Sequence, residues 1–260
     1  MPHTRRSLMK WLNVALVTWA VLNSSMALAV PEAICVPWKS NESLPHWTYD
    51  WKTITLKGIA RGDATEYKWE YGDGGETAWM PIGNPYNLAV QHAYTGVPGQ
   101  LFIARLHVRN AGGEESQDTY PIAMFECIDL RNTNHLEVAK NVAIDEGLWR
   151  LHVNLVRGTY GAGSPGYGQP YGYWVDSTYG YHLPATGSGL EAFQLNGHKV
   201  LSDYDKDPYA ETVQRAMNYL LASIRTYSIT PQPAGDPDTN GNGIGLVANN
   251  ASANRQTYIG

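Results

Sequence analysis

The chain has 260 residues, of which 43% are hydrophobic and 17% charged. This is the composition of a globular protein with room for about two domains, and it excludes a disordered or coiled-coil chain. The formal net charge of −5 argues against nucleic acid or an anionic membrane as a partner, since both bind basic patches.

Residues 1–29 have the pattern of an export signal. Arg5, Arg6 and Lys10 form a basic start, an apolar stretch follows, and an A-x-A cleavage site ends at Ala29. The arginine pair also resembles the twin-arginine export motif of bacteria and archaea, and a Sec signal with an adventitious pair is the alternative. The sequence therefore predicts a secreted or cell-surface protein. Removing the signal takes away three of 19 basic residues and none of 24 acidic ones, so the mature formal charge is −8.

After this signal no segment approaches the 18 consecutive apolar residues that a membrane-spanning helix needs. The two cysteines, Cys35 and Cys127, bracket a β-rich segment. In an oxidising compartment such a pair is typical of a disulfide that ties the ends of a module. Two free thiols are the alternative, which export of a folded and reduced chain favours.

A linker is expected at 30–45, and strand patterns fill residues 46–128. Polar and apolar residues alternate over 53–57, 67–71 and 101–108, with turn residues between these runs. Several short strands separated by turns predict a small β-sandwich.

Three motifs in this segment occur in a fixed order: Trp-Glu-Tyr-Gly-Asp-Gly at 69–74, His-Ala-Tyr at 92–94, and Leu-His-Val-Arg-Asn-Ala-Gly-Gly at 106–113. Together they resemble a polycystic-kidney-disease (PKD) domain. Tyr71 replaces the usual Phe of that family, and the connection to His92 is longer than is typical. The resemblance implies an immunoglobulin-like sandwich used outside the cell for adhesion, spacing or glycan contact, and it implies no catalysis.

Two polar residues of these motifs have structural roles in our interpretation. Asp73 is expected to accept hydrogen bonds within its own turn. His92 is expected to be a hydrogen-bonding residue near Tyr94, because no cysteine or second histidine lies at the spacing of metal ligands.

The period changes to that of helices over residues 133–260. Helices are predicted at 135–156 with Asn134 as N-cap, at 187–196, and from Pro208 with Asp207 as N-cap. The fold class is therefore multidomain β + α, a sandwich followed by a helical segment.

The first and third predicted helices share a weak pattern of residue types. It is accompanied by the sequences Ala-Phe-Gln-Leu-Asn-Gly-His at 192–198 and Asp-Pro-Tyr-Ala-Glu-Thr-Val at 207–213. Together these stretches resemble an α/α toroid of the terpenoid-cyclase and prenyltransferase superfamily. A toroid needs about twice as many helices, and residues 253–260 look like the opening of another helix. We expect the toroid to be incomplete and the chain to be the N-terminal part of a longer protein. The acid motif of the cyclases and the zinc ligands of the transferases have no match here, so no catalytic residue is assigned.

A Gly- and Tyr-rich loop at 158–181 carries the candidate binding residues Tyr171, Tyr173 and Trp174. Their aromatic faces are suited to stacking on sugar rings. Glu191 alone is not a glycosidase signature, because glycosidases use paired carboxylates. The alternative is a tyrosine-packed loop between helices.

Asp236, Asp238 and Asn240 have the oxygen-ligand spacing of a calcium loop, with Gly241 at the sixth position. Val247 stands where an EF-hand has its bidentate Glu, which argues against a standard EF-hand. Calcium is the one cofactor that the sequence suggests, and a polar turn is the alternative.

Two functions follow from these patterns. The first is a non-enzymatic surface or secreted protein, whose PKD-like module binds a glycan or another surface protein and is joined to a helical scaffold. The second is the N-terminal part of a secreted α/α-toroid enzyme, a carbohydrate-active hydrolase or lyase or a terpenoid-cyclase relative, with its catalytic residues beyond Gly260. For the chain as given we favour the first.

Overall fold

The computed structural model describes most of the chain after the predicted signal, namely residues 30–36, 46–49, 51–126, 129, 131–176, 181–200, 207–229, 233, 235, 238–239, 241–250 and 255–258. The predicted signal at 1–29 lies outside these residues. No helix in the described part of the chain is long and apolar enough to cross a membrane.

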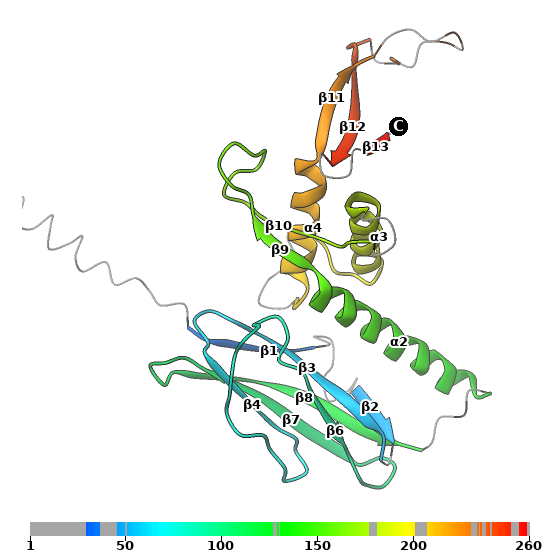
Figure 1. Cartoon of the computed structure of the whole chain (residues 1–260). Helices are drawn as coiled ribbons and strands as arrows, with labels where there is room; N and C mark the ends of the chain where they lie inside the picture. Colours follow the sequence, from blue (N-terminus) through cyan, green and yellow to red (C-terminus); the bar gives the residue numbers. More distant parts are fainter. Residues whose placement is uncertain are drawn as a thin grey trace, which may run out of the picture.

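Two sheets form a sandwich (Figure 1). The smaller sheet has the strand order β1-β3-β6 and is antiparallel; its strands are β1 (Glu32–Val36), β3 (Thr53–Arg61) and β6 (Val90–Ala93). The larger sheet has the order β2-β8-β7-β4-β5, with β2 parallel to β8; its strands are β2 (His46–Tyr49), β4 (Glu66–Glu70), β5 (Met80–Pro81), β7 (Leu101–Arg109) and β8 (Glu115–Phe125). The predicted β-sandwich is confirmed by this topology.

The sandwich begins earlier than predicted, because β1 lies in the expected linker. Ala33 and Cys35 point into the core, while Ile34 and Val36 point to the outer side. The backbone N–H of Cys35 donates to the carboxylate of Asp118 on β8 at 2.7 Å. β1 therefore pairs with β3 and also reaches across to the opposite sheet.

Cys35 is a free thiol in the structure, so the predicted disulfide with Cys127 is not formed there. Its side chain is buried in the sandwich core. Burial raises the pKa of the Cys35 thiol well above its usual value, which makes the thiol unreactive. Cys127 lies outside the described residues.

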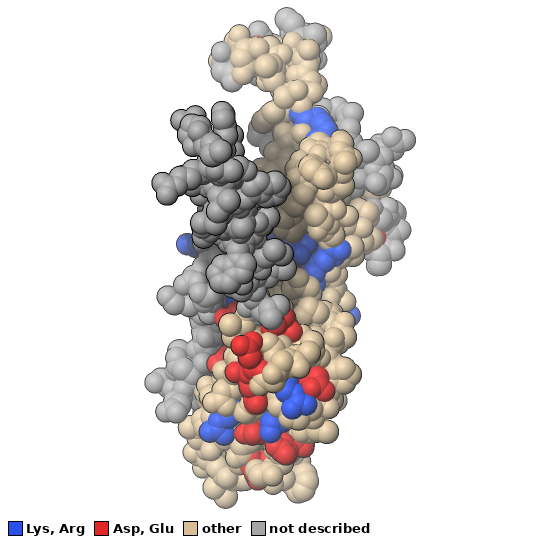
Figure 2. Space-filling model, turned by 90° about the vertical axis from the view of Figure 1, so that its left-hand side faces the viewer, with Lys and Arg blue, Asp and Glu red and all other residues tan. Residues whose placement is uncertain are grey.

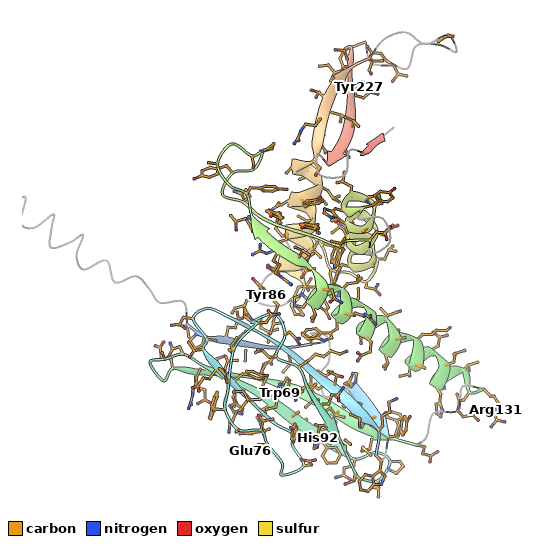
Figure 3. The ribbon with its side chains drawn as sticks, in the orientation of Figure 1. Trp69, Glu76, Tyr86, His92, Arg131 and Tyr227 are labelled. Carbon is orange, nitrogen blue, oxygen red and sulfur yellow. The ribbon has the colours of Figure 1, made fainter. Side chains whose placement is uncertain are left out.

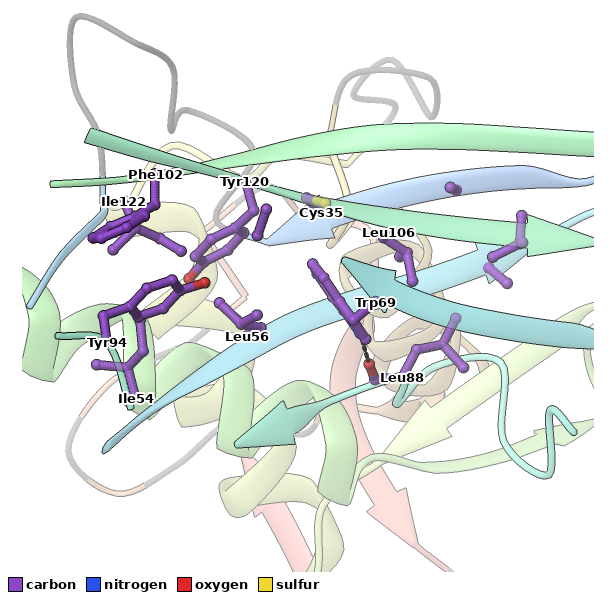
Figure 4. Close-up of a cluster of buried hydrophobic side chains, with 14 of the residues drawn as sticks. Cys35, Ile54, Leu56, Trp69, Leu88, Tyr94, Phe102, Leu106, Tyr120 and Ile122 are labelled. Atoms are coloured by element: carbon purple, nitrogen blue, oxygen red, sulfur yellow. Dashed lines mark hydrogen bonds between the residues drawn. The ribbon is translucent and has the colours of Figure 1, made fainter. Parts of the chain in front are cut away.

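Trp69 lies at the centre of the core and is fully buried. Its indole N–H donates to the carbonyl of Leu88 at 2.7 Å, and its ring meets Tyr120 edge-on with centroids 6.2 Å apart (Figure 4). A buried Trp is costly unless its N–H finds an acceptor, and the Leu88 carbonyl supplies one. The predicted alternation of β4 is confirmed, since Tyr67 and Tyr71 pack against the same core.

Three helices follow: α2 (Thr133–Asn154), α3 (His182–Leu195) and α4 (Ala210–Ala222). The N-cap of α2 is Asn132 and not Asn134; its side chain accepts from the Asn134 N–H at 3.0 Å. Asp207 accepts from the Tyr209 N–H at 2.9 Å, so it supports the start of α4, which begins two residues after the expected Pro208.

The described residues do not support a toroid, because sheets interrupt the helices. A hairpin of β9 (Val156–Thr159) and β10 (Pro170–Tyr173) separates α2 from α3. After α4 the chain forms an antiparallel sheet of β11 (Ile224–Ser228), β12 (Ile244–Asn250) and β13 (Arg255–Tyr258). β13 occupies the stretch that was expected to open another helix.

The helical unit packs on the outer face of the smaller sheet, and the two share one apolar core. Ile34, Val36 and Ile59 of the sandwich contact a cluster that includes Trp149 of α2 and Val213 of α4. Figure 1 shows α2 on the β1–β3 side of the sandwich.

Polar contacts cross the same junction. Lys57 of β3 forms an ion pair with Glu146 of α2 at 2.5 Å. The ring of His152 of α2 lies 3.1 Å from the carbonyl of Tyr86, which Figure 3 shows beside the junction. The molecule thus has three layers, helices, small sheet and large sheet, and the outer face of the large sheet lies opposite the helices.

Candidate binding face

The outer face of the large sheet carries a regular array of charges, which we call the open face. Alternation along β4 and β7 turns every second side chain outward. The register sets Glu66 opposite Arg109 and Glu70 opposite Arg105, two acidic–basic pairs, with Lys68 opposite His107 between them.

Lys68 links two carboxylates on this face. Its Nζ lies 3.1 Å from Glu76 and 3.2 Å from Glu70. The hydrogen bond from Lys68 holds the pKa of the Glu70 carboxyl below its usual value, and the bonds to Glu76 and Glu70 raise the pKa of Lys68. Each such surface pair contributes less than about 1 kcal/mol to stability.

His107 is fixed between two carboxylates. Its Nε2 lies 3.2 Å from Glu70 and its Nδ1 lies 2.9 Å from Glu115 on β8. These contacts set the orientation of the ring and tie the charges of β4, β7 and β8 into one network.

An aromatic ring lies beside this network. The Arg109 guanidinium lies 4.1 Å from the centroid of the Trp79 ring, and the Lys68 Nζ lies 5.8 Å from it. Glu66 accepts from Arg109 at 2.8 Å, which holds the guanidinium over the ring. Cation–π contacts of this kind orient an aromatic side chain at a partly exposed site.

A hollow of about 270 Å³ adjoins the network and is lined by Glu70, Gly72, Gly74, Gly75, Glu76 and Arg105. Gly72 has φ of 83° and Gly74 has φ of 100°, backbone conformations that favour glycine. A side chain at Gly72 would also meet the backbone of Ile103, so the wall of the hollow requires glycine there.

The turn that forms this wall is held by the predicted polar residues. Asp73 accepts from the Gly75 N–H at 2.9 Å and lies 2.7 Å from Nε2 of His92. The His92 ring stacks on Tyr71 with centroids 3.8 Å apart and meets Tyr94 edge-on. Partial burial alone would raise the pKa of Asp73, but the bonds from His92 and Gly75 hold it below its usual value. The structural roles predicted for both residues are confirmed.

Figure 2 shows the distribution of charge on one side of the molecule. Acidic and basic side chains gather together over the sandwich, and the described surface beyond it has few charges on that side. Figure 3 places Glu76 at the outer side of the sandwich and Trp69 within it.

The structure places Trp174 in the interior of the helical unit. Its indole N–H donates to the Leu151 carbonyl at 2.8 Å, and its ring stacks on Phe193 with centroids 6.0 Å apart. Because the side chain is buried, the ring joins α2 to α3 and has no face free for a sugar.

Tyr171 and Tyr173 lie on β10 and are half-buried. Tyr171 contacts the ring of Tyr160 at 4.5 Å, and Tyr173 stacks on His182 at 4.5 Å and contacts Tyr219 at 5.0 Å. Rings that pack against one another in this way match the alternative interpretation, a tyrosine-packed connection between helices.

For the calcium loop, Asp236 and Asn240 lie outside the described residues. Asp238 accepts from the Gly243 N–H at 2.6 Å and from the Asn242 N–H at 3.2 Å, which closes the turn before β12. Within the described residues no group of three or more His, Cys, Asp or Glu side chains is placed to hold a metal ion. Calcium binding stays a prediction.

Trp79, Lys68 and Glu76 were not among the residues singled out from the sequence. The available signal was the alternation of charge along β4 and β7, with outward Arg105 and Arg109. That pattern identifies a solvent face, and only the contacts of Trp79 with Lys68 and Arg109 show that the ring joins it.

No family model and no curated protein matches the chain. Among solved structures, a PKD domain of an M14-like peptidase from a Thermoplasmatales archaeon is similar over 37% of this chain and 94% of its own, with 18% identity and a TM-score of 0.27. A carbohydrate-binding module of the β-sandwich superfamily is similar over 38% of this chain and 36% of its own, with 19% identity and a TM-score of 0.28.

The PKD1 domain of the Vibrio cholerae metalloprotease PrtV is also similar, over 37% of this chain and 99% of its own, with 12% identity and a TM-score of 0.24. Each similarity spans little more than a third of this chain. At these identities the likeness concerns the sandwich fold alone, and the site rests on the contacts described above.

Proposed function

We propose that this is an exported, non-enzymatic protein that binds a glycan on the open face, with the helical unit as a scaffold behind the sandwich. The observation that supports the proposal is the Trp79 ring near Lys68, because the same Lys68 contacts Glu70 and Glu76, which line the hollow. A flat aromatic ring next to fixed hydrogen-bonding groups is the combination that recognises a sugar, whose ring has an apolar face and a polar edge.

The layered fold supports the same assignment. The helical unit covers the smaller sheet, where Ile59 and Val36 are buried against it. The open face carries charges that the fold does not need for its core, since exposed ion pairs contribute little to stability. A sheet face held rigid from behind is a preorganised surface, and this lowers the entropic cost of binding.

The first experiment is a glycan array with the chain from Val30 onward. The expected result is binding of a restricted set of glycans without their breakdown. An array on which no glycan is retained above background contradicts the proposal, and release of shortened products supports the enzyme alternative.

The second experiment measures affinity for the best array ligand by isothermal titration. Trp79→Ala is expected to weaken binding about tenfold or more, because loss of a stacking contact costs about 1–2 kcal/mol. Trp51→Ala is the matched control: Trp51 is 74% exposed, but it lies in the turn between β2 and β3. If Trp79→Ala and Trp51→Ala bind the glycan with equal affinity, Trp79 is not part of the binding site.

A charge pair of variants completes the test. Lys68→Met removes the cation that joins Glu70, Glu76 and the Trp79 ring, so it is expected to weaken binding. Lys140→Met is its control on α2, where Lys140 pairs with Glu137 in solvent.

A further inference from the structure

The hairpin of β11 and β12 projects from the helical unit, away from the sandwich (Figure 1). Tyr227 lies on it (Figure 3). In the sheet order β11-β12-β13, β11 is an edge strand that pairs only with β12 among the described residues. Ile224 is half-buried and the other four residues of β11 are exposed.

The hydrogen-bonding pattern shows which backbone groups of β11 point outward. The Ile229 N–H donates to the Gly243 carbonyl at 3.0 Å, next to the pair of Ser228 with Ile244. Hydrogen-bonded and non-hydrogen-bonded pairs alternate along an antiparallel ladder. The outward N–H and C=O groups of the strand are therefore those of Ile224, Thr226 and Ser228.

Two features favour pairing of this edge with another strand. Among the described residues, β13 pairs with β12 only from Val247 to Asn250, so the outer part of the described hairpin is two-stranded. Such ribbons are marginally stable in water. Ile244 is 52% exposed and Leu246 is 47% exposed on the same face as Thr226. An open edge with exposed apolar side chains is a template for another extended strand.

We propose that β11 pairs antiparallel with β11 of a second copy of this chain, about a two-fold axis at Thr226. This register sets Thr226 opposite the partner's Thr226, and Ile224 opposite the partner's Ser228. The outward groups of both strands then face one another and form about six backbone hydrogen bonds. The contact is isologous, so it closes as a dimer and does not propagate.

Side-chain complementarity favours a second copy as the occupant. In this register Arg225 lies opposite the partner's Tyr227, on both sides of the axis, and like charges do not meet. A cation beside an aromatic ring is a favourable cross-strand pair. Arg225 now donates to the carbonyls of Ala222 and Ile224 at 2.7 and 2.8 Å, which holds its side chain at the strand. The Ile224 carbonyl has a second lone pair for the partner strand.

The test is sedimentation equilibrium of the chain from Val30 onward, from micromolar to millimolar concentration. The expected result is a reversible rise from the mass of one chain to twice that mass. A monomer over the whole range, or a mass that rises beyond the dimer, would overturn the proposal.

Thr226→Pro is the decisive variant, because it removes an outward donor and no hydrogen bond to β12, and proline is tolerated on the open side of an edge strand. It is expected to stay monomeric, and Thr226→Val, which keeps the backbone donor, to dimerise like the wild type. Unchanged dimerisation of the proline variant contradicts this register.

A charge exchange tests the register independently of the proline. Tyr227→Lys sets two cations opposite each other and is expected to weaken the dimer several-fold. Adding Arg225→Glu restores an attractive pair and is expected to recover it. Absence of recovery, with both variants folded by circular dichroism, would place the second copy elsewhere.

Discussion

The ion pair between Lys57 and Glu146 gives an asymmetric prediction about the junction of the two units. The Lys57 side chain is fully buried, whereas that of Glu146 is 46% exposed, and the two are 2.5 Å apart. The Lys57 Nζ makes no other hydrogen bond within the described residues. The lysine therefore depends on the glutamate more than the glutamate depends on the lysine.

Glu146→Ala leaves a buried ammonium without its partner, and we expect it to lower the free energy of unfolding by about 3 kcal/mol, the low end for such breaks because the carboxylate is partly solvated. Lys57→Met replaces the ammonium ion by an apolar side chain of similar volume, and the Glu146 carboxylate rotates toward the solvent. The free energy of unfolding is then expected to stay within about 1 kcal/mol of the wild type.

Urea unfolding at pH 7, followed by Trp fluorescence, measures both values. The double variant is expected to match Lys57→Met, since the lysine that needed compensation is gone. Glu137→Ala, on the same helix but in an exposed pair with Lys140, is the control and is expected to change stability by less than about 0.5 kcal/mol. If Lys57→Met proves the more damaging variant, the reasoning about the buried ammonium is refuted.

Three further predictions concern the fold. Burial lowers the pKa of His152 to about 3, so the unfolded chain binds a proton at this residue more readily than the folded chain does. The contribution of His152 to the free energy of unfolding is therefore complete above about pH 6.5 and is lost as pH falls toward 3. Urea midpoints between pH 7 and pH 4 measure the loss, and His152→Asn should flatten the slope. Trp69→Phe removes the donor to the Leu88 carbonyl and is expected to cost about 2–4 kcal/mol, measured by urea unfolding with a Tyr probe. Gly72→Ala forces a methyl group against the Ile103 backbone at positive φ, and should lower the melting temperature by several degrees through a loss of about 1–3 kcal/mol; an unchanged melting temperature would contradict that geometry.

The sandwich was predictable from local pattern. Trp69 sits on the apolar side of an alternating run, and the glycines after Tyr71 end that run, so the strand and its turn follow from period and turn chemistry. β1 was missed because its residues, Ile34 and Val36 among them, are apolar on both faces. A strand buried on both sides shows no alternation, and only the helical unit on its outer face explains why.

The candidate site was less predictable, for a related reason. The sequence alone does not distinguish the surroundings of Trp174 from those of Trp79. In the structure the first is buried between helices and the second lies beside the charges of β4 and β7. Trp79 is half-buried and Trp174 is buried, and this difference depends on contacts between distant segments. The β9–β10 hairpin was likewise hidden, because Gly158 and Gly172 lie within a Gly- and Tyr-rich stretch that carries no periodic signal.

The central claim is that the ligand binds on the open face of the large sheet and not on the β9–β10 hairpin, which carries Tyr171 and Tyr173. Hydrogen exchange of the chain with and without the best array glycan tests it directly. The predicted result is slower exchange in residues 70–79 and 101–109, with no change in residues 156–173. Protection confined to the hairpin, with the open face unaffected, would contradict the account.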